Sequence, residues 1–230
     1  MSFRKIPMEN NRRWARERVS SDPDFLKRLA TVQKPEILWI GCSDTRGSAP
    51  DFIGLQPGEL FVHRNITNVA YHTDINCQSV LEYAIEALEV RYIVVCGHYN
   101  CGGIRHAIEN TEFGIIDNWL KEVKDVYQAH RGELRVIEDS TARLNRLSEL
   151  NVRHQALNVC RTSVVQKAWA RGRELSVHAW IYDVNDGLVH DLKYSFRAPL
   201  QRRAGLPLPR DRTAQSRARR LAETMIPGAR

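Results

Sequence analysis

The sequence has no long hydrophobic segment, and this absence argues against a membrane protein. No apolar run in its 230 residues approaches the roughly 18 residues that a membrane-spanning helix needs. Basic side chains occur in residues 1–13, but the apolar stretch of a signal peptide does not follow them. We therefore expect a cytoplasmic protein that has no membrane partner.

Cysteine is also scarce, and its number excludes a disulfide-stabilised scaffold. The sequence contains an odd set of five, namely Cys42, Cys77, Cys96, Cys101 and Cys160. In a reducing compartment, cysteines at the ends of strands are metal ligands or nucleophiles more often than disulfide partners. The apolar surroundings of Cys77, Cys96 and Cys160 predict buried, unreactive thiols.

Acidic residues are rare at the C-terminal end, and most of the net charge of +7 arises there. Residues 201–230 contain eight arginines against Asp211 and Glu223, which leaves residues 1–200 almost neutral. We therefore expect one catalytic domain over residues 1–200 and a basic extension over residues 201–230. Because the body carries almost no net charge, we expect no specific nucleic-acid partner.

Apolar runs of strand length alternate with helical patterns along the chain. Strands are predicted over residues 36–41, 60–62, 92–96, 175–182 and 188–193. Helices are predicted over residues 11–19, 24–31, 76–88, 116–130 and 147–169, and another begins near Gly102. This order predicts an α/β fold with N-terminal helices and a mainly parallel sheet flanked by helices. The turn at residues 185–187 predicts an antiparallel edge strand.

Two predicted strands end in side chains that can bind a metal ion. Residues 38–46 read LWIGCSDTR, and residues 92–103 read YIVVCGHYNCGG. The carboxyl ends of parallel strands meet at one edge of a sheet, so Cys42 would lie near His98 and Cys101. Two thiolates and one imidazole form a zinc set that leaves a fourth position open. A cysteine at a strand end can also be a small buried hydrophobe, but that does not explain the nearby Asp44 and Arg46.

Four segments together resemble the β-class carbonic anhydrases. They are CSDTR at 42–46, QPGELFVHRN at 56–65, HTDINC at 72–77 and GHYNCGG at 97–103. The resemblance extends over roughly residues 10–194 and leaves only the C-terminal extension outside. It implies zinc-dependent, reversible hydration of carbon dioxide to bicarbonate and a proton, with a hydroxide activated by zinc as the nucleophile.

The resemblance also assigns roles to individual residues. It makes Cys42, His98 and Cys101 the zinc ligands, with Asp44 occupying the fourth position in a closed form and Arg46 drawing it away in an open form. Because hydroxide competes with the carboxylate for that position, rising pH should open the site. The family's substrate pocket corresponds here to Gln33, Phe61, Ile66, Tyr83 and Gly102. That pocket lies at a subunit interface in the family, which implies a homodimer or homotetramer.

One bacterial subgroup of the family resembles the chain further, because bicarbonate inhibits its members from a non-catalytic pocket. The corresponding residues here are Trp39, Gly41, Arg64 and Tyr182. An arginine, an indole N–H and a phenol are suitable donors for a small oxyanion. The subgroup usually continues Val-Pro-Ala-Glu after the CSDxR motif, whereas residues 47–50 here read GSAP. This departure changes the loop around the anion.

Three further hypotheses remain open from the sequence. The protein could be a zinc-stabilised binding protein whose arginine-rich extension contacts a polyanion. It could instead hydrolyse a related cumulated molecule such as carbon disulfide. His63, His72 and His106 are candidates for passing the released proton to buffer, although a histidine near a strand end is more often a hydrogen-bonded structural residue.

Overall fold

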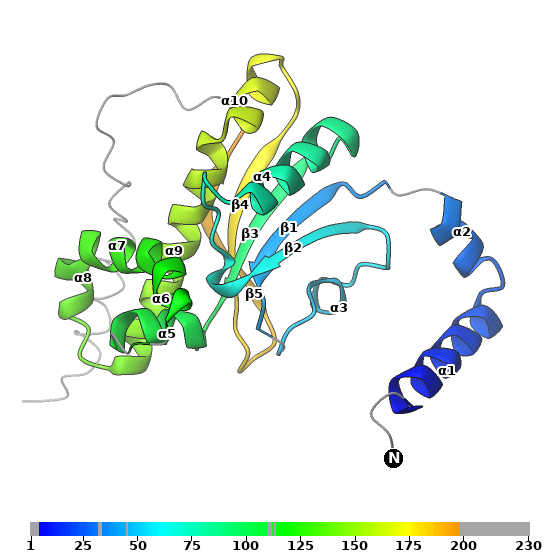
Figure 1. The fold of residues 1–230 in the computed structure, drawn as a ribbon, viewed down its shortest axis with the longest axis horizontal. Coiled ribbons are helices and arrows are strands. Elements are labelled where there is room, and N and C mark those ends of the chain that lie inside the picture. Colours follow the sequence, from blue (N-terminus) through cyan, green and yellow to red (C-terminus); the bar gives the residue numbers. More distant parts are fainter. Residues whose placement is uncertain (1–4, 32–33, 45, 110–111, 113, 198–230) are drawn as a thin grey trace, which may run out of the picture. The chain divides into compact units, whose positions relative to one another are not determined.

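The computed structural model describes residues 5–31, 34–44, 46–109, 112 and 114–197, and all structural statements below concern these residues. They form a five-stranded sheet in the order β2-β1-β3-β4-β5 (Figure 1). Its strands are β1 (Ile37–Cys42), β2 (Leu60–Asn65), β3 (Tyr92–His98), β4 (Ser176–Tyr182) and β5 (Val189–Phe196). Neighbouring strands from β2 to β4 are parallel, and β5 is antiparallel to β4. The predicted fold class is confirmed.

Helical segments connect these strands. They are α1 (Lys5–Ser21), α2 (Phe25–Thr31), α3 (Ala49–Ile53), η1 (Ile66–Asn68), α4 (Ile75–Glu82), η2 (Tyr83–Ala87), α5 (Gly102–Glu109), α6 (Ile115–Trp119), α7 (Lys121–Ala129), α8 (Arg131–Arg135), α9 (Ser140–Arg161) and α10 (Ser163–Ala170). No described helix is both long enough and apolar enough to span a bilayer.

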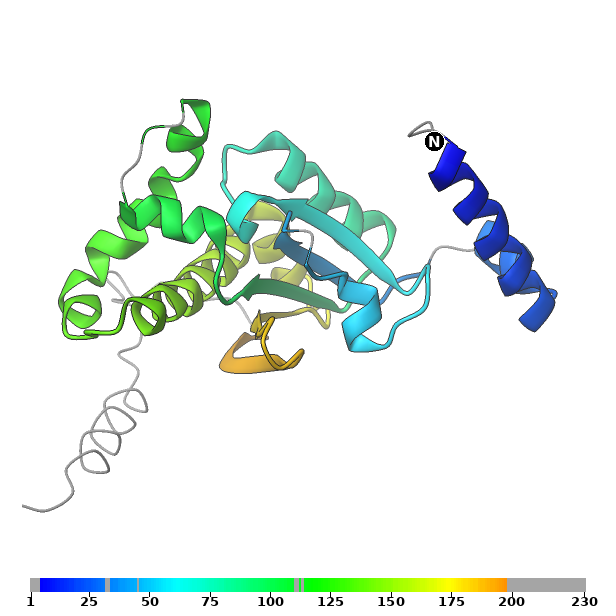
Figure 2. The ribbon, with the colours of Figure 1, turned by 90° about the horizontal axis from the view of Figure 1, so that it is seen from below.

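The central strands β1 and β3 are covered on both faces of the sheet, because successive side chains point to opposite sides and consecutive residues of these strands are buried. Leu38 and Ile40 of β1 are fully buried, and Trp39 between them is 3% exposed. Helix α9 packs along β3 and β4 (Figures 1 and 2). A Cβ atom on Gly97 would lie 2.5 Å from Val152 of α9, so only glycine allows this close approach.

Four predicted boundaries were wrong. The single helix predicted over 147–169 is two helices, because Thr162 is extended (φ −63°, ψ 147°) between α9 and α10. Helix α9 also starts earlier than predicted, where Asp139 caps it by accepting a hydrogen bond from the Ala142 N–H. The predicted helix over 116–130 is divided into α6 and α7 at Leu120. Strand β2 continues to Asn65, three residues past its predicted end.

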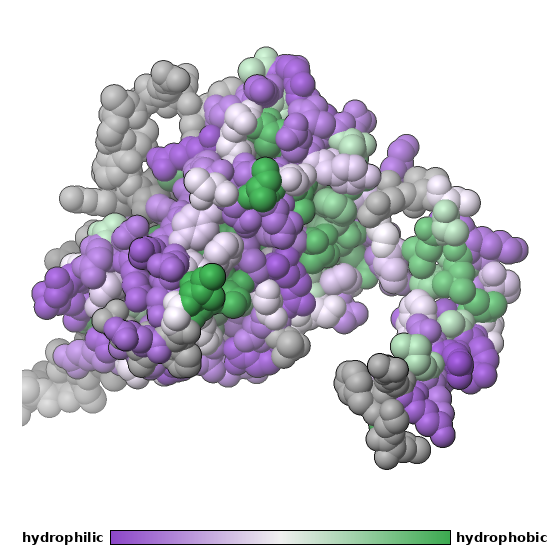
Figure 3. All heavy atoms as spheres, in the orientation of Figure 1, coloured by the Kyte–Doolittle hydropathy of each residue, from purple (hydrophilic) through white to green (hydrophobic). Residues whose placement is uncertain are grey.

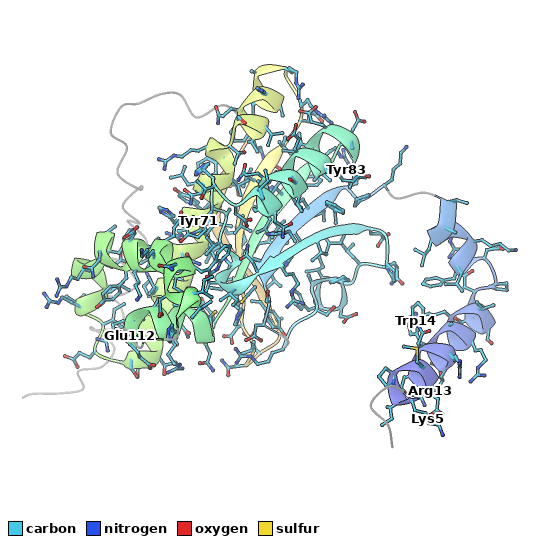
Figure 4. All side chains as sticks on the ribbon, viewed as in Figure 1. Lys5, Arg13, Trp14, Tyr71, Tyr83 and Glu112 are labelled. Carbon is cyan, nitrogen blue, oxygen red and sulfur yellow. The ribbon has the colours of Figure 1, made fainter. Side chains whose placement is uncertain are left out.

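The two N-terminal helices contact each other through aromatic side chains. Trp14 of α1 and Phe25 of α2 meet edge-on, with ring centroids 6.2 Å apart, and Trp14 is labelled in Figure 4. Helix α1 is longer than the predicted 11–19 and has no buried residue. Apolar side chains also reach the surface elsewhere, where green areas border purple ones in Figure 3. Ile75 and Ile115 are the most exposed of the described large hydrophobic residues, at 79% and 88%.

Candidate metal centre

The carboxyl ends of β1 and β3 bring three ligand-type side chains together. Cys42 ends β1, His98 ends β3, and Cys101 directly precedes α5. Their ligand atoms all lie within 4.8 Å of one another, and the two sulfur atoms are 4.0 Å apart. Strands β1 and β3 are direct neighbours in the sheet, as the sequence prediction required. We call these three residues the Cys/His/Cys group.

His98 is oriented so that one ring nitrogen is available for a metal ion. Its Nδ1 lies 3.0 Å from the Tyr99 carbonyl oxygen, which can only accept, so Nδ1 carries the hydrogen. In the neutral ring the Nε2 atom therefore keeps its lone pair, and it is buried without a hydrogen-bond partner in the protein. A buried polar atom left without a partner costs about 1–3 kcal/mol. A bound metal ion would satisfy this atom.

The two thiols of the group differ in acidity because they share a hydrogen bond. Either sulfur can be the donor in this hydrogen bond, which lowers the pKa of Cys42, and His98 lowers it further. The same hydrogen bond, together with burial, raises the pKa of Cys101. The shared hydrogen bond thus favours the thiolate at Cys42 over the thiolate at Cys101. Sulfur and imidazole ligands in this number fit zinc and disfavour magnesium or calcium.

Asp44 lies beside the group and is held by Arg46. The Arg46 backbone N–H and Nε both donate to Asp44 Oδ1 at 2.9 Å, and Nη2 donates to Oδ2 at 2.8 Å. These bonds lower the pKa of Asp44 to about 2, and the largest contribution comes from the side-chain hydrogen bonds of Arg46. Its Oδ2 lies 3.9 Å from His98 Nε2. An ionised carboxylate in a fixed orientation therefore stands next to the candidate ligands, engaged by arginine.

Arg64 supports the loop that follows β1. Its Nε donates to the Cys42 carbonyl at 2.7 Å, and its Nη2 donates to the carbonyls of Asp44 and Gly47. The guanidinium group thus fixes the backbone on which the Asp44 side chain is mounted. It also borders a cavity of about 180 Å³ whose lining includes Trp39 and Tyr182. The structure therefore brings three of the four predicted anion-pocket residues together.

An aromatic stack beside this cavity was missed by the sequence analysis. Phe52 of α3 stacks on Tyr182, with ring centroids 4.3 Å apart and planes 10° from parallel. A Cβ atom on Gly47 would lie 3.0 Å from the Phe52 ring and 3.4 Å from the Tyr182 ring. Glycine at position 47, in place of the valine usual in the bacterial subgroup, thus makes room for the stacked rings of Phe52 and Tyr182. Gly41, the fourth predicted residue, is equally constrained, because its Cβ would lie 2.6 Å from Trp39 Nε1.

The predicted substrate-pocket residues are partly brought together. The Phe61 and Tyr83 rings are neighbours with centroids 5.8 Å apart, and Tyr83 is labelled in Figure 4. Ile66 lies against the start of α5, where a Cβ on Gly103, next to Gly102, would lie 3.1 Å from its Cγ2. Gln33 lies outside the described residues.

Two consecutive residues of η1 adopt left-handed backbone conformations beside the site. Thr67 and Asn68 have φ values of 63° and 49°, which residues other than glycine adopt at an energetic cost. Asn151 of α9 holds this turn by donating to the Thr67 carbonyl at 3.0 Å. The Asn65 side chain bonds both the N–H and the carbonyl of Val69. Neighbouring sequence gives no signal for the Asn151 contact, because it comes from far along the chain.

The three histidines proposed as proton carriers differ in their surroundings. His63 is 6% exposed, and its Nε2 lies 3.2 Å from Asn65 Nδ2. His106 Nε2 lies 3.0 Å from a carboxylate oxygen of Asp117. His72 is exposed. Proton transfer by any of them stays a prediction.

A mainly parallel sheet with a Cys/His/Cys group at its carboxyl edge defines an α/β protein with a candidate metal centre. The comparisons with known proteins then identify the family. The model of the carbonic anhydrase family matches residues 37–189. The chain is 46% identical over 188 residues to a carbonic anhydrase of Emericella nidulans, and the match covers 82% of each protein.

Solved structures agree with this assignment. A Coccomyxa β-carbonic anhydrase in complex with acetazolamide superposes with a TM-score of 0.82 at 36% identity, covering 86% of this chain and 90% of that one. A structure from a study of two tetrameric β-carbonic anhydrases of Sordaria macrospora gives a TM-score of 0.80 at 39% identity. The match covers 83% of this chain and 97% of that one. The chain belongs to the β-class carbonic anhydrases, which are zinc enzymes.

Proposed function

We propose that this carbonic anhydrase holds its zinc ion through Cys42, His98 and Cys101 and hydrates carbon dioxide reversibly to bicarbonate and a proton. The observation that carries the proposal is the buried, unpartnered Nε2 of His98 next to two cysteine sulfur atoms that lie 4.0 Å apart. When bound, zinc supplies a Lewis acid that acidifies water and so provides hydroxide at moderate pH. Stopped-flow hydration assays of the zinc-loaded protein test the activity.

Asp44 orients the nucleophile in this proposal. Its carboxylate is ionised and faces the ligand group, where it can accept a hydrogen bond from the attacking hydroxide and leave a lone pair free for carbon dioxide. The planar fork of Arg46 fixes both carboxylate oxygens, which a lysine could not do. Arg46→Lys should therefore reduce turnover while zinc binding is retained, and unchanged turnover would contradict this role.

The same carboxylate serves as a pH-dependent gate. In the closed form Asp44 takes the fourth zinc position, and in the open form Arg46 holds it away. Because hydroxide competes with Asp44 for one position, higher pH favours the open form. The described arrangement, with Asp44 paired to Arg46, is the pairing that the open form requires. A rise of activity with pH in wild type that moves to lower pH in Asp44→Ala would support the gate, and an unmoved rise would contradict it.

Bicarbonate inhibits the enzyme from the cavity between Trp39, Arg64 and Tyr182, as in the regulated bacterial subgroup. The cavity has a cation and aromatic donors in its lining, which supports this assignment. Arg64→Ala removes the cation but also the bonds to the loop carbonyls, so Tyr182→Phe is the matched variant that removes one hydroxyl and keeps the ring. Weaker inhibition in both variants supports the site. Unchanged inhibition in both contradicts it.

The active unit is a homodimer or homotetramer. The edge strand β2 leaves Val62 40% exposed, and Ile66 and Tyr83 beside it are also exposed. A tetrameric assembly is stated for the Sordaria relative. Light scattering of the purified protein tests the assembly. A monomer that is fully active would contradict the proposal.

The catalytic unit comprises residues 1–200, and the basic extension is accessory. Deleting residues 201–230 should leave turnover and zinc content unchanged, and an inactive truncation would contradict this division. The same assays decide the remaining alternatives. Full zinc without hydration activity would favour a polyanion-binding protein or a hydrolase of a related substrate such as carbon disulfide.

A further inference from the structure

Asn100 occupies an unusual position between two of the candidate zinc ligands. It follows β3 and lies two residues after His98 and one before Cys101. Its φ of 54° is in the left-handed region, which asparagine tolerates better than most residues but which still carries strain. Strain of this kind persists only where surrounding contacts impose it. The contacts of Asn100 therefore show what this conformation achieves.

The backbone of Asn100 connects the tips of two strands. Its carbonyl accepts a hydrogen bond from Arg46 Nη2 at 3.0 Å, and this same nitrogen holds Asp44 Oδ2 at 2.8 Å. Its N–H donates to Asn145 Oδ1 of α9 at 3.2 Å. The Arg46 fork is thus attached on one side to Asp44 and on the other to the loop that carries both His98 and Cys101.

We propose that Asn100 is a positioning residue for the hydration reaction, and that its left-handed backbone aims a carbonyl at Arg46 so that the Asp44 carboxylate keeps a fixed place relative to the zinc ligands. Apart from the bond to the Asn100 carbonyl, the hydrogen bonds that the structure gives to Arg46 all go to Asp44, so Arg46 and Asp44 could otherwise move together. The bond to Asn100 connects both residues to the loop that carries His98 and Cys101. The inference rests on the proposed function of Asp44.

The side chain of Asn100 makes a separate contact that the test must separate from the backbone effect. Its Oδ1 accepts a hydrogen bond from Arg105 Nη2 of α5 at 2.7 Å. Asn100→Gly removes this contact and keeps the left-handed conformation without strain. Asn100→Ala removes the contact and disfavours that conformation, and Asn100→Val disfavours it more strongly. Arg105→Gln removes the contact and leaves the backbone of residue 100 unchanged.

The experiment measures kcat, KM, zinc per chain and thermal unfolding for the four variants at one fixed pH. We expect Asn100→Ala and Asn100→Val to lose about ten- to hundredfold in kcat, the range for loss of an outer contact at a metal site, with KM and zinc content little changed. Asn100→Gly and Arg105→Gln should stay within about twofold of wild type. This rescue by glycine is what a purely local side-chain role would not produce.

A readout independent of turnover is the visible spectrum of the cobalt-substituted protein, which reports the ligands around the ion. Asn100→Ala should show a changed spectrum at that pH, and Asn100→Gly should match wild type. The proposal is overturned if Asn100→Ala equals wild type in both readouts, or if Asn100→Gly or Arg105→Gln loses as much as Asn100→Ala. An inactive wild-type protein would instead refute the proposed function, so the two failures are distinguishable.

Discussion

Three groups of metal-ligand side chains lie among the described residues, and the two that contain both histidine and cysteine differ in the hydrogen bonding of the histidine ring. One is the Cys/His/Cys group, and the other is formed by His63, Asp74 and Cys77, which we call the His/Asp/Cys group. The ligand atoms within each group lie within 4.8 Å of one another. Proximity and residue type therefore do not distinguish them.

Hydrogen bonding separates the two groups. In the His/Asp/Cys group, His63 Nε2 accepts a hydrogen bond from the side-chain amide of the neighbouring Asn65. The same amide also donates to the Val69 carbonyl and accepts from the Val69 N–H. Asp74 caps α4 by accepting from the Asn76 N–H at 3.1 Å. His98 Nε2 in the Cys/His/Cys group has no such partner. The buried Nε2 of His98 therefore lacks the hydrogen bond that Nε2 of His63 already has.

Thiol acidity separates the groups in the same direction. Burial, reinforced by the negative charge of Asp74, raises the pKa of Cys77 to about 12. The thiol of Cys42 instead has its pKa lowered by Cys101 and His98. Since a metal binds the thiolate, zinc would have to remove a tightly held proton at Cys77, whereas the thiolate of Cys42 is favoured. Cys101, whose pKa is raised, would also have to lose its proton. The comparison favours the Cys/His/Cys group, with its unpartnered His98 Nε2 and its more acidic Cys42, as the metal centre.

The largest effect is expected from substitutions of the three residues in the Cys/His/Cys group. Cys42→Ser, His98→Ala and Cys101→Ser should each lose zinc on dialysis and lose more than about a hundredfold in activity, beyond the range seen for outer contacts. Cys77→Ser is the matched control because it changes the same atom type in the other group. Metal analysis per chain and hydration assays measure both. A ligand variant with full zinc, or a Cys77 variant without it, would reverse the comparison.

The second-largest effect is expected from removing the Asp44 carboxylate, which lies beside the Cys/His/Cys group. Asp44→Ala should keep one zinc per chain and lose about 10²–10⁴-fold in kcat, the usual contribution of a positioned proton-handling group. Asp51→Asn on α3 is an exposed carboxylate control that should retain turnover. Steady-state kinetics with metal analysis distinguishes loss of chemistry from loss of zinc. Normal turnover in Asp44→Ala would exclude the proposed role.

Thiol reactivity sharpens the comparison without mutation. After zinc is removed with a chelator, Cys42 should react with an alkylating reagent at neutral pH, because its lowered pKa keeps the thiolate populated. Burial raises the pKa of the other three thiols outside the group, Cys77, Cys96 and Cys160. They should react only after unfolding. Mass spectrometry of labelled peptides reads each site, and fast labelling of Cys77 would contradict the account.

The smallest effect concerns the pH dependence of stability. Burial lowers the pKa of His63 below the ordinary value of 6.5, so the unfolded chain takes up this proton more readily than the folded one. Its contribution to stability is complete above pH 6.5 and is lost as the pH falls from there toward the folded pKa. His63→Gln should flatten this acid slope in urea unfolding, and the exposed control His72→Gln should not. If the stability of wild type, His63→Gln and His72→Gln fell equally with decreasing pH, the lowered pKa of His63 would be contradicted.

The sequence predicted the parts of the site that depend on strand order. Cys42 and His98 lie at the ends of apolar runs, and neighbouring parallel strands must bring such ends together. The helix break at Thr162 was missed because a β-branched residue within an apolar pattern gives no stop signal. The start of α9 at Asp139 could have been found, since Asp followed by Ser and Thr is a capping pattern.

The supporting contacts could not have been predicted. Asn151 reaches Thr67, Arg46 reaches the Asn100 carbonyl, and Phe52 stacks on Tyr182, each across a long stretch of sequence. These contacts depend on tertiary packing, and neither spacing nor composition records them. The family resemblance therefore gave the ligand types, and the structure added the groups that orient them.

The most direct test of the central claim is zinc content per chain measured together with stopped-flow carbon dioxide hydration between about pH 6.5 and 9. The account predicts one zinc per chain in wild type and in Cys77→Ser, none in Cys42→Ser, and wild-type hydration that increases toward alkaline pH. Zinc retained by Cys42→Ser and lost from Cys77→Ser would place the metal in the His/Asp/Cys group and contradict the account.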